Sequence, residues 1–335
     1  MEKLHFIQIA NYITENGKSI SAKLSYQTFG KALHSAPIIL VNHALTGNSN
    51  VVGKDGWWND IIGDNKCIDT NNYTILAFNI LGNGFDNIAE NCIENYKDFT
   101  ARDIAKLFAL AIEQLKIKNL FAVIGGSVGG GIAWELAALK PRLIQHLIPI
   151  ATDWKSTDWV IANCHIQDSL LNNSSQPLVD ARMHAMTLYR TPESLTQKFE
   201  RTKKSDSLYN IESWLSYHGN ALENRFQVAA YKLMNQILRT IDITRNRTDF
   251  LEVASNIESD IHIITINSDL FFKADENWNT YVDLKAVKDN VNIHEIKSVH
   301  GHDAFLIEFD QLSRFLKPIF SSQLKSNKKL ETQVA

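Results

Sequence analysis

The chain has 335 residues, of which 44% are hydrophobic and 21% are charged. This composition supports one large core with room for an inserted subdomain. The formal net charge of -3 argues against the basic surface that a nucleic-acid backbone or an anionic membrane attracts. We therefore expect small-molecule chemistry, with no nucleic-acid partner and no membrane partner.

The amino-terminal residues become polar before the apolar stretch and cleavage site of a signal peptide could develop. No segment approaches the roughly 20 apolar residues of a membrane span. Cys67, Cys92 and Cys164 are widely separated and have no histidine partner at metal-ligand spacing. The sequence predicts a soluble cytoplasmic protein with free thiols and no metal site.

Short β-rich runs alternate with helical periodicity in the first half, which is typical of a mostly parallel sheet covered by helices. Between Thr100 and Lys116 apolar residues recur every three or four positions, and Thr100 is placed to cap the first turn. A second helix is expected from Val128 to Leu139. The predicted strands are Ile38–Val41, Tyr73–Phe78, Leu120–Ile124, Leu147–Ile150, Ile261–Ile266 and Val291–Ile296.

Strand patterns are missing from Thr152 to Arg247, which is far too long for a plain loop and carries helical signals instead. The many aromatic residues of this segment indicate either a cap over a pocket or the packing of a subdomain core. The predicted division is a first core part at 1–151, a helical cap at 152–250, a second core part at 251–320 and a polar tail at 321–335.

The run Gly125-Gly126-Ser127-Val128-Gly129 matches the G-x-S-x-G pattern, with an apolar strand before it and an apolar helix after it. This context predicts a nucleophile elbow, in which small neighbours let the strand and the helix pack closely. Ser127 would then stand at the positive end of a helix, where backbone N–H groups stabilise an oxyanion. A phosphate-binding loop is disfavoured, because no Lys-Ser or Lys-Thr follows.

A serine hydroxyl needs a base to become a nucleophile, so an acid and then a histidine should follow in the chain. Asp269 comes just after the predicted strand Ile261–Ile266, although many aspartates in such places only cap a turn. His300 and His302 both follow the last predicted strand. Their positions alone do not decide which one is the base.

Seven further runs occur together along the chain. They are His43-Ala44-Leu45-Thr46-Gly47, Gly56-Trp57-Trp58, Ile124-Gly125-Gly126-Ser127, Ala181-Arg182, Tyr189-Arg190, Arg225-Phe226 and Gly301-His302-Asp303-Ala304-Phe305-Leu306. In this combination the chain, from Leu40 to Leu306, resembles the homoserine O-acetyltransferase family, whose members acylate homoserine for methionine biosynthesis. The resemblance implies an α/β-hydrolase fold with Ser127 as nucleophile, His302 as base and Asp269 as acid.

The resemblance also implies binding residues. The Leu45 and Val128 amides would form the oxyanion hole, and Arg182, Tyr189 and Asp303 would hold homoserine. An arginine fork suits a carboxylate, and an aspartate suits an ammonium group, although Arg182 could instead pair with a cap carboxylate such as Asp180. Acetyl-CoA would be a substrate rather than a bound cofactor, and a homodimer would form through the cap.

Four departures from the family pattern concern the acyl-donor site. Asn83–Asn87 replaces a Gly-Ser-Thr-Gly-Pro run, the segment between Asn163 and Arg182 is shortened, Gln227 stands where an aspartate is usual, and Asn42 stands where a cysteine is common. The alternatives left open are a serine esterase with water as acceptor and a homoserine O-succinyltransferase. A catalytically silent scaffold is disfavoured by the intact Ser, Asp and His set.

Overall fold

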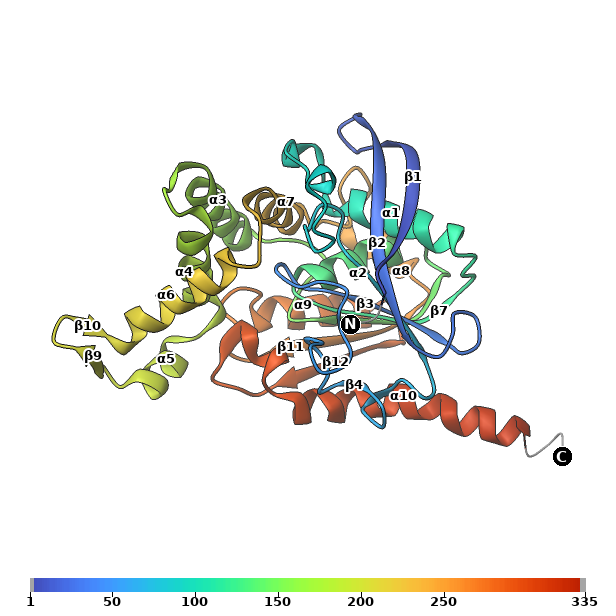
Figure 1. Ribbon diagram of the computed structural model, residues 1–335. Coiled ribbons are helices and arrows are strands. Elements are labelled where there is room, and N and C mark those ends of the chain that lie inside the picture. Colours follow the sequence, from blue (N-terminus) through green and yellow to red (C-terminus); the bar gives the residue numbers. More distant parts are fainter. Residues whose placement is uncertain (1–2, 332–335) are drawn as a thin grey trace.

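The computed structural model describes residues 3–331 and places an eight-stranded sheet at the centre of the molecule (Figure 1). The strand order is β1-β2-β6-β3-β7-β8-β11-β12. The pairs from β6 to β12 are parallel, whereas β1 and β2 run antiparallel to their neighbours. The strands are β1 (His5–Ile13), β2 (Ser19–Gly30), β3 (Ile38–Asn42), β6 (Thr74–Phe78), β7 (Leu120–Gly126), β8 (Ile144–Ile150), β11 (Asp260–Ile266) and β12 (Val291–Ile296). The predicted mostly parallel sheet is confirmed.

The burial of each strand follows from its place in the sheet. Every residue of β3 and β7 is buried, because helices or loops cover both faces of the parallel strands and favour continuous apolar runs. In β1 and β2 buried and exposed residues largely alternate, as expected of antiparallel strands with one solvated face. These two strands were not among those predicted, since their apolar runs are interrupted by polar residues.

Helices cover one face of the sheet and meet it through a shared buried cluster. The helix α1 begins as predicted after Thr100. The Thr100 hydroxyl accepts a hydrogen bond from the Asp103 amide, and the Asp103 carboxylate accepts one from the Thr100 amide. The opposite face is covered by α10 and by the loop region that holds the short ribbon β4 (Ile62–Gly63) and β5 (Ile68–Asp69). The helices are α1 (Ala101–Gln114), α2 (Val128–Leu139), α8 (Phe250–Ser255), α9 (Ala274–Lys285) and α10 (Phe309–Glu331).

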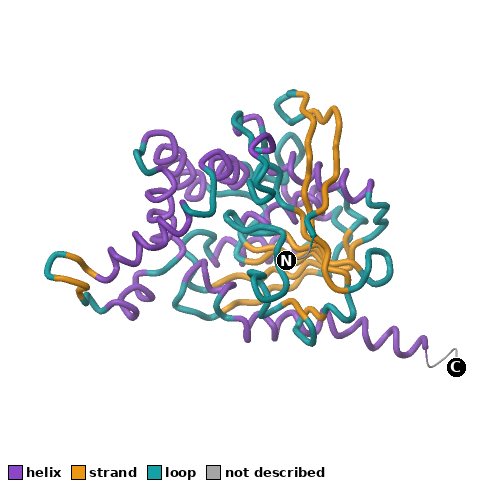
Figure 2. Tube along the Cα trace, in the orientation of Figure 1, coloured by secondary structure: helices purple, strands orange, loops and turns teal. Residues whose placement is uncertain are grey.

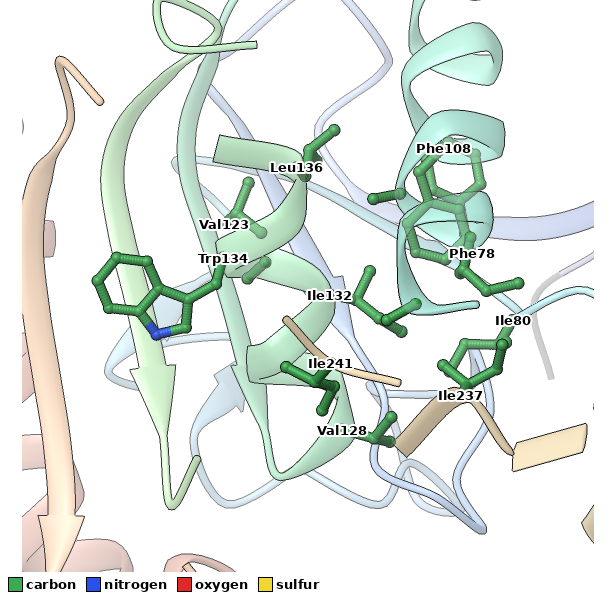
Figure 3. Packing of buried hydrophobic residues seen from close by; sticks show 14 of the residues in the cluster. Phe78, Ile80, Phe108, Val123, Val128, Ile132, Trp134, Leu136, Ile237 and Ile241 are labelled. Carbon is green, nitrogen blue, oxygen red and sulfur yellow. The ribbon is translucent and has the colours of Figure 1, made fainter. Parts of the chain in front are cut away.

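The helix α2, which follows the predicted elbow, is buried among side chains from several elements (Figure 3). Ile132 belongs to the same apolar cluster as Phe78 of β6 and Phe108 of α1, whose rings lie 4.9 Å apart. Ile237 and Ile241 enter this cluster from the segment inserted after β8. The inserted segment therefore packs directly onto the helix that follows Ser127.

The inserted segment is mostly helical and projects beyond the sheet (Figures 1 and 2). Its helices are α3 (Asp158–Asn173), α4 (Pro177–Tyr189), α5 (Pro192–Phe199), α6 (Asn210–Glu223) and α7 (Val228–Arg239). A small hairpin of β9 (Lys203–Ser205) and β10 (Leu208–Tyr209) forms its outer tip, and it was not predicted because its strands are too short to show alternation. We call this segment, from α3 to α7, the cap. The boundaries at 151, 250 and 320 remain predictions.

The last helix extends into the segment predicted as a polar tail. Helix α10 continues to Glu331, so most of that segment is helical, while 332–335 lie outside the described residues. Within residues 3–331, no helix is both long enough and apolar enough to cross a membrane.

Candidate active site

Ser127 occupies the turn between β7 and α2 with a left-handed φ of 56° and a ψ of -130°. Such a backbone is strained for a residue with a side chain, and it persists only when its surroundings hold it. The Ser127 amide donates to the Ile150 carbonyl at 2.9 Å. A Cβ on Gly129 would stand 2.6 Å from the Asn42 carbonyl oxygen, and one on Gly130 would stand 2.3 Å from Thr152 Cγ2. Gly129, the last residue of the G-x-S-x-G run, and Gly130 after it are therefore needed for this turn.

Ser127, His302 and Asp269 form a continuous chain of hydrogen bonds. The Ser127 Oγ atom lies 2.9 Å from His302 Nε2, and His302 Nδ1 lies 2.7 Å from Asp269 Oδ2. Since an ionised carboxylate can only accept, Nδ1 carries the proton and Nε2 is free to accept the serine proton. All three side chains are buried. This is the geometry by which a serine is activated as a nucleophile.

The structure separates the two candidate histidines. His300 Nδ1 contacts the Ser194 hydroxyl at 2.9 Å and the Arg190 guanidinium at 3.0 Å, away from Ser127. Only His302 bonds to both Ser127 and Asp269 among the residues described. The geometry therefore selects His302 as the candidate base.

Asp269 is fixed by its own turn. Its Oδ1 atom accepts the backbone amides of Phe271 at 2.7 Å and Phe272 at 3.0 Å, which leaves Oδ2 for His302. The two amides were not foreseen as parts of the site. The sequence signal for them is an aspartate at the end of a strand. Such a side chain commonly accepts hydrogen bonds from the backbone amides two and three residues later in the chain.

The electrostatic surroundings of His302 favour its protonated form. Burial lowers the pKa of His302, but the Asp269 carboxylate, through its charge and its hydrogen bond, and the charge of Asp303 together raise the pKa above its usual value. The rings of Tyr189, Phe271, Phe272 and Phe305 surround the imidazole at centroid distances of 5.3, 5.4, 5.9 and 5.9 Å. These rings leave the imidazole little freedom to move.

The two expected oxyanion donors lie on neighbouring segments. Strands β3 and β7 pair in parallel with Asn42 opposite Gly125, so the turn after β3 and the elbow after β7 leave the sheet side by side. Val128 is the first residue of α2, where a backbone N–H has no acceptor within its helix. Leu45 is buried in the turn after β3, and within the described chain its N–H donates to no acceptor. The sheet register thus brings the two loops that hold these donors together.

Comparison with known proteins identifies the family. The sequence model of the alpha/beta hydrolase fold matches residues 37–295, and a homoserine O-acetyltransferase from Methanococcus vannielii is 32% identical over 94% of this chain and 72% of its own length. The chain belongs to the homoserine O-acetyltransferase family. The predicted family and fold are confirmed.

Solved structures agree with this fold. The homoserine O-acetyltransferase from Bacillus anthracis has a TM-score of 0.85 at 20% identity, over 95% of this chain and 97% of its own. Esterase E22 has a TM-score of 0.85 at 16% identity, over 96% of this chain and 100% of its own. At these identities the likeness concerns the fold alone.

Helix α4 carries two of the three expected acceptor residues, Arg182 and Tyr189, and the third, Asp303, directly follows His302. Arg182 Cζ lies 5.8 Å from the ring centroid of Tyr189, which contacts His302. Burial raises the pKa of Asp303, while the charge of Arg182 is the largest of those that lower it, so these two charges lie near each other. Among the side chains of residues 3–321, no carboxylate lies within 4 Å of the Arg182 guanidinium. The Asp180 carboxylate accepts the Ser174 hydroxyl instead.

A second arginine, Arg225, also reaches this region. Its Nη1 atom donates to the Thr46 carbonyl at 2.9 Å, in the turn that holds Leu45. Burial lowers the pKa of Arg225, and the positive charge of Arg182 lowers it further, which places the two guanidinium groups near each other. Arg225 was not among the predicted site residues, although the Arg225-Phe226 run was one of those shared with the family.

The segments that depart from the family pattern make specific contacts. Asn42 donates from Nδ2 to the Gly129 carbonyl at 3.0 Å, which ties β3 to the start of α2. Gln227 Oε1 accepts a hydrogen bond from the Cys92 thiol at 2.9 Å. If Gly84 carried a Cβ atom, that atom would lie 3.6 Å from Gln227 Cδ. The Asn83–Asn87 loop and Gln227 are therefore in mutual contact. Cys67, Cys92 and Cys164 are free, as predicted.

A small hollow lies beside Tyr189 and Phe271, whose rings contact His302. A cavity of about 10 Å³ is lined by residues that include Leu45, Tyr189 and Phe271. Larger hollows of about 940 and 760 Å³ share Lys118 and Arg142, and no triad residue lines either of them. No group of three or more potential metal ligands occurs in the part of the chain that the structure describes.

Proposed function

We propose that the protein is a homoserine O-acetyltransferase that forms an acetyl-serine intermediate at Ser127. The observation that carries the proposal is the hydrogen-bonded chain from Ser127 through His302 to Asp269, near the guanidinium of Arg182, which forms no ion pair with any described side chain. Acetyl-CoA is a substrate, and no bound cofactor takes part. Family membership further supports a homodimer formed through the cap and a location in the cytoplasm.

In the first half-reaction His302 Nε2 removes the Ser127 proton while Oγ attacks the thioester carbonyl carbon. The negative charge that develops on the carbonyl oxygen is stabilised by the Leu45 and Val128 N–H groups. The carbon–sulfur bond then breaks, and His302 returns its proton to the thiolate of coenzyme A. Asp269 stabilises the imidazolium form during this transfer.

In the second half-reaction homoserine occupies the space left by coenzyme A. Arg182 binds the homoserine carboxylate through a planar pair of N–H donors, and Asp303 accepts hydrogen bonds from the homoserine ammonium group. His302 removes the proton of the homoserine hydroxyl, whose oxygen attacks the acetyl carbonyl carbon. The bond to Ser127 Oγ breaks, Oγ takes the proton from His302, and O-acetylhomoserine leaves.

The test is a steady-state screen of acetyl-CoA and succinyl-CoA against homoserine, serine and water. We expect acetyl-CoA with homoserine to give the highest kcat/KM, with coenzyme A release and O-acetylhomoserine formation in equal amounts. Continued steady-state release of coenzyme A without homoserine, beyond the single burst that acylates Ser127, would instead indicate an esterase. A preference for succinyl-CoA would identify a homoserine O-succinyltransferase.

A further inference from the structure

His43 is a buried imidazole that no catalytic step above uses. It lies at the start of the turn after β3 and makes two hydrogen bonds to backbone groups. Its Nδ1 atom lies 2.7 Å from the Ala44 carbonyl oxygen, and its Nε2 atom lies 3.0 Å from the Ile80 amide nitrogen. It therefore connects the turn that holds Leu45 to the chain just beyond β6.

These partners fix the tautomer of His43. A backbone N–H can only donate, so Nε2 must accept from Ile80, and the ring proton must then be on Nδ1, where it is donated to Ala44. Burial lowers the pKa of His43 to about 4, so the ring is neutral at physiological pH. His43 thus presents one donor and one acceptor in fixed directions.

The bond to Ala44 acts on a particular peptide group. The Ala44 carbonyl and the Leu45 N–H belong to the same planar trans peptide, so they point in opposite directions. The Ala44 carbonyl also accepts the Gly47 amide at 2.9 Å. With two donors on its oxygen, the peptide group cannot rotate freely, and the direction of the Leu45 N–H is fixed with it.

We infer that His43 is a positioning residue for the oxyanion hole, and that its Nδ1–H orients the Leu45 N–H toward the oxyanion formed at Ser127. The inference rests on the proposed acyl-serine chemistry. An oxyanion hole works because its donors are oriented before the reaction begins. A residue that fixes a donor therefore changes the rate of acylation rather than the binding of the acyl donor.

A matched pair of substitutions separates this role from simple packing. Asparagine places an amide nitrogen where Nδ1 stands, so His43→Asn keeps a donor to Ala44 but leaves the Ile80 amide without an acceptor. Glutamine places its amide where Nε2 stands, so His43→Gln keeps an acceptor for Ile80 and loses the donor to Ala44. A buried N–H without a partner destabilises the fold more than a carbonyl that keeps a second donor.

The expected results for the two variants run in opposite directions. His43→Asn should have the lower melting temperature but acylate Ser127 within about threefold of the wild-type rate, because the Leu45 N–H keeps its direction. His43→Gln should be the more stable variant but acylate about 10- to 100-fold more slowly, with the KM for acetyl-CoA within about twofold of wild type. General destabilisation cannot produce this reversal.

The rate is measured as the burst of coenzyme A release after rapid mixing with acetyl-CoA, in the absence of homoserine. His262 is the matched control, because burial lowers its pKa also to about 4 and it lies near the amino end of β11, away from the triad. His262→Asn and His262→Gln should both give the wild-type burst rate.

Three outcomes decide the matter. A wild-type burst with equal rates for the two His43 variants overturns the inference and leaves the proposed function standing. No burst in the wild-type protein overturns the proposed function itself. If the His43 variants do not fold, nitrogen-15 NMR of the wild-type imidazole is decisive, because a proton on Nδ1 supports the inference and a proton on Nε2 overturns it.

Discussion

The ring of Phe305 lies directly against Gly126, and its Cε2 atom is 2.5 Å from the position that a Cβ on Gly126 would take. Gly126 is the last residue of β7 and precedes Ser127. Phe305 is in the short helix η3 (Gly301–Leu306), which also holds His302. This contact therefore joins the two segments that supply the nucleophile and the base, and its dimensions help to set the 2.9 Å between Ser127 Oγ and His302 Nε2.

Gly126→Ala should separate these two segments. The added methyl group would overlap the Phe305 ring, and overpacking of this kind costs about 1 to 3 kcal/mol of folding free energy. We expect a lower melting temperature and a kcat reduced by about tenfold or more, because the Ser127–His302 hydrogen bond would lengthen. Calorimetry and steady-state kinetics with acetyl-CoA and homoserine measure the two effects.

Combining Phe305→Leu with Gly126→Ala tests whether the contact between these two residues causes the predicted losses. A smaller side chain at 305 gives space to the methyl group of Gly126→Ala, so the double variant should be more active and more stable than the sum of the single effects predicts. Additive effects would show that Gly126 and Phe305 act independently. The contact would then not set the geometry of the triad.

His302→Ala should remove nearly all activity, whereas His300→Ala should not. Loss of the imidazole that bonds both Ser127 and Asp269 is expected to lower kcat by about 10⁴-fold. His300 contacts only Ser194 and Arg190 among the described residues, so its loss should lower kcat by less than about tenfold. Steady-state kinetics with acetyl-CoA and homoserine measure kcat for both variants, and a larger loss for His300→Ala would contradict the assignment of the base.

The elements nearest the chemistry were predictable because their local signals agree with their tertiary surroundings. The bounds of α2 match the expected Val128–Leu139 helix, and β11 lies where its largely buried β-branched run predicts. Local pattern and buried environment favour the same structure there. Ser127 and Asp269 could be placed from the sequence because each follows a strand of this kind.

Other features depend on contacts that no local pattern contains. The choice of His302 over His300 from position alone was impossible, because both are in one turn and only the fold shows which ring meets Ser127. The role of His43 was equally hidden, since its partner Ile80 is 37 residues away. The β1–β2 hairpin was missed because its apolar residues gain burial only against the rest of the sheet.

Asp303→Asn should move the acid limb of the acylation reaction to lower pH. His302 acts as a base only when neutral, so the rate falls as pH decreases through its pKa. The negative charge of Asp303 helps to raise this pKa, and removal of the charge makes the imidazolium less stable. The pKa of His302 should therefore fall, and the variant should keep more of its maximal rate in acid.

The measurement is the pH profile of coenzyme A release without homoserine, so that the expected role of Asp303 in acceptor binding does not enter. Asp275→Asn is a suitable control, because Asp275 is an exposed carboxylate that pairs with Lys273, and its acid limb should coincide with that of the wild-type protein. An acid limb for Asp303→Asn that is unchanged, or moved to higher pH, would contradict the electrostatic coupling.

Arg182→Lys should impair the acceptor half-reaction alone. Lysine keeps the positive charge but loses the planar pair of donors that binds a carboxylate, and hydrogen bonds to charged groups contribute about 1.5 to 3 kcal/mol. We therefore expect the KM for homoserine to rise by about tenfold or more. The burst of coenzyme A release without homoserine should stay near the wild-type rate, because Arg182 contacts Tyr189 and lies near Asp303 but bonds to none of the triad residues that the structure describes.

Arg142→Lys tests the general effect of replacing an arginine with a lysine. Arg142 is exposed and pairs with Glu258, so this substitution should leave both half-reactions unchanged. An Arg182→Lys burst slowed as much as overall turnover would place Arg182 in the donor site or in the support of the fold, and the homoserine site would have to be sought elsewhere in the cap.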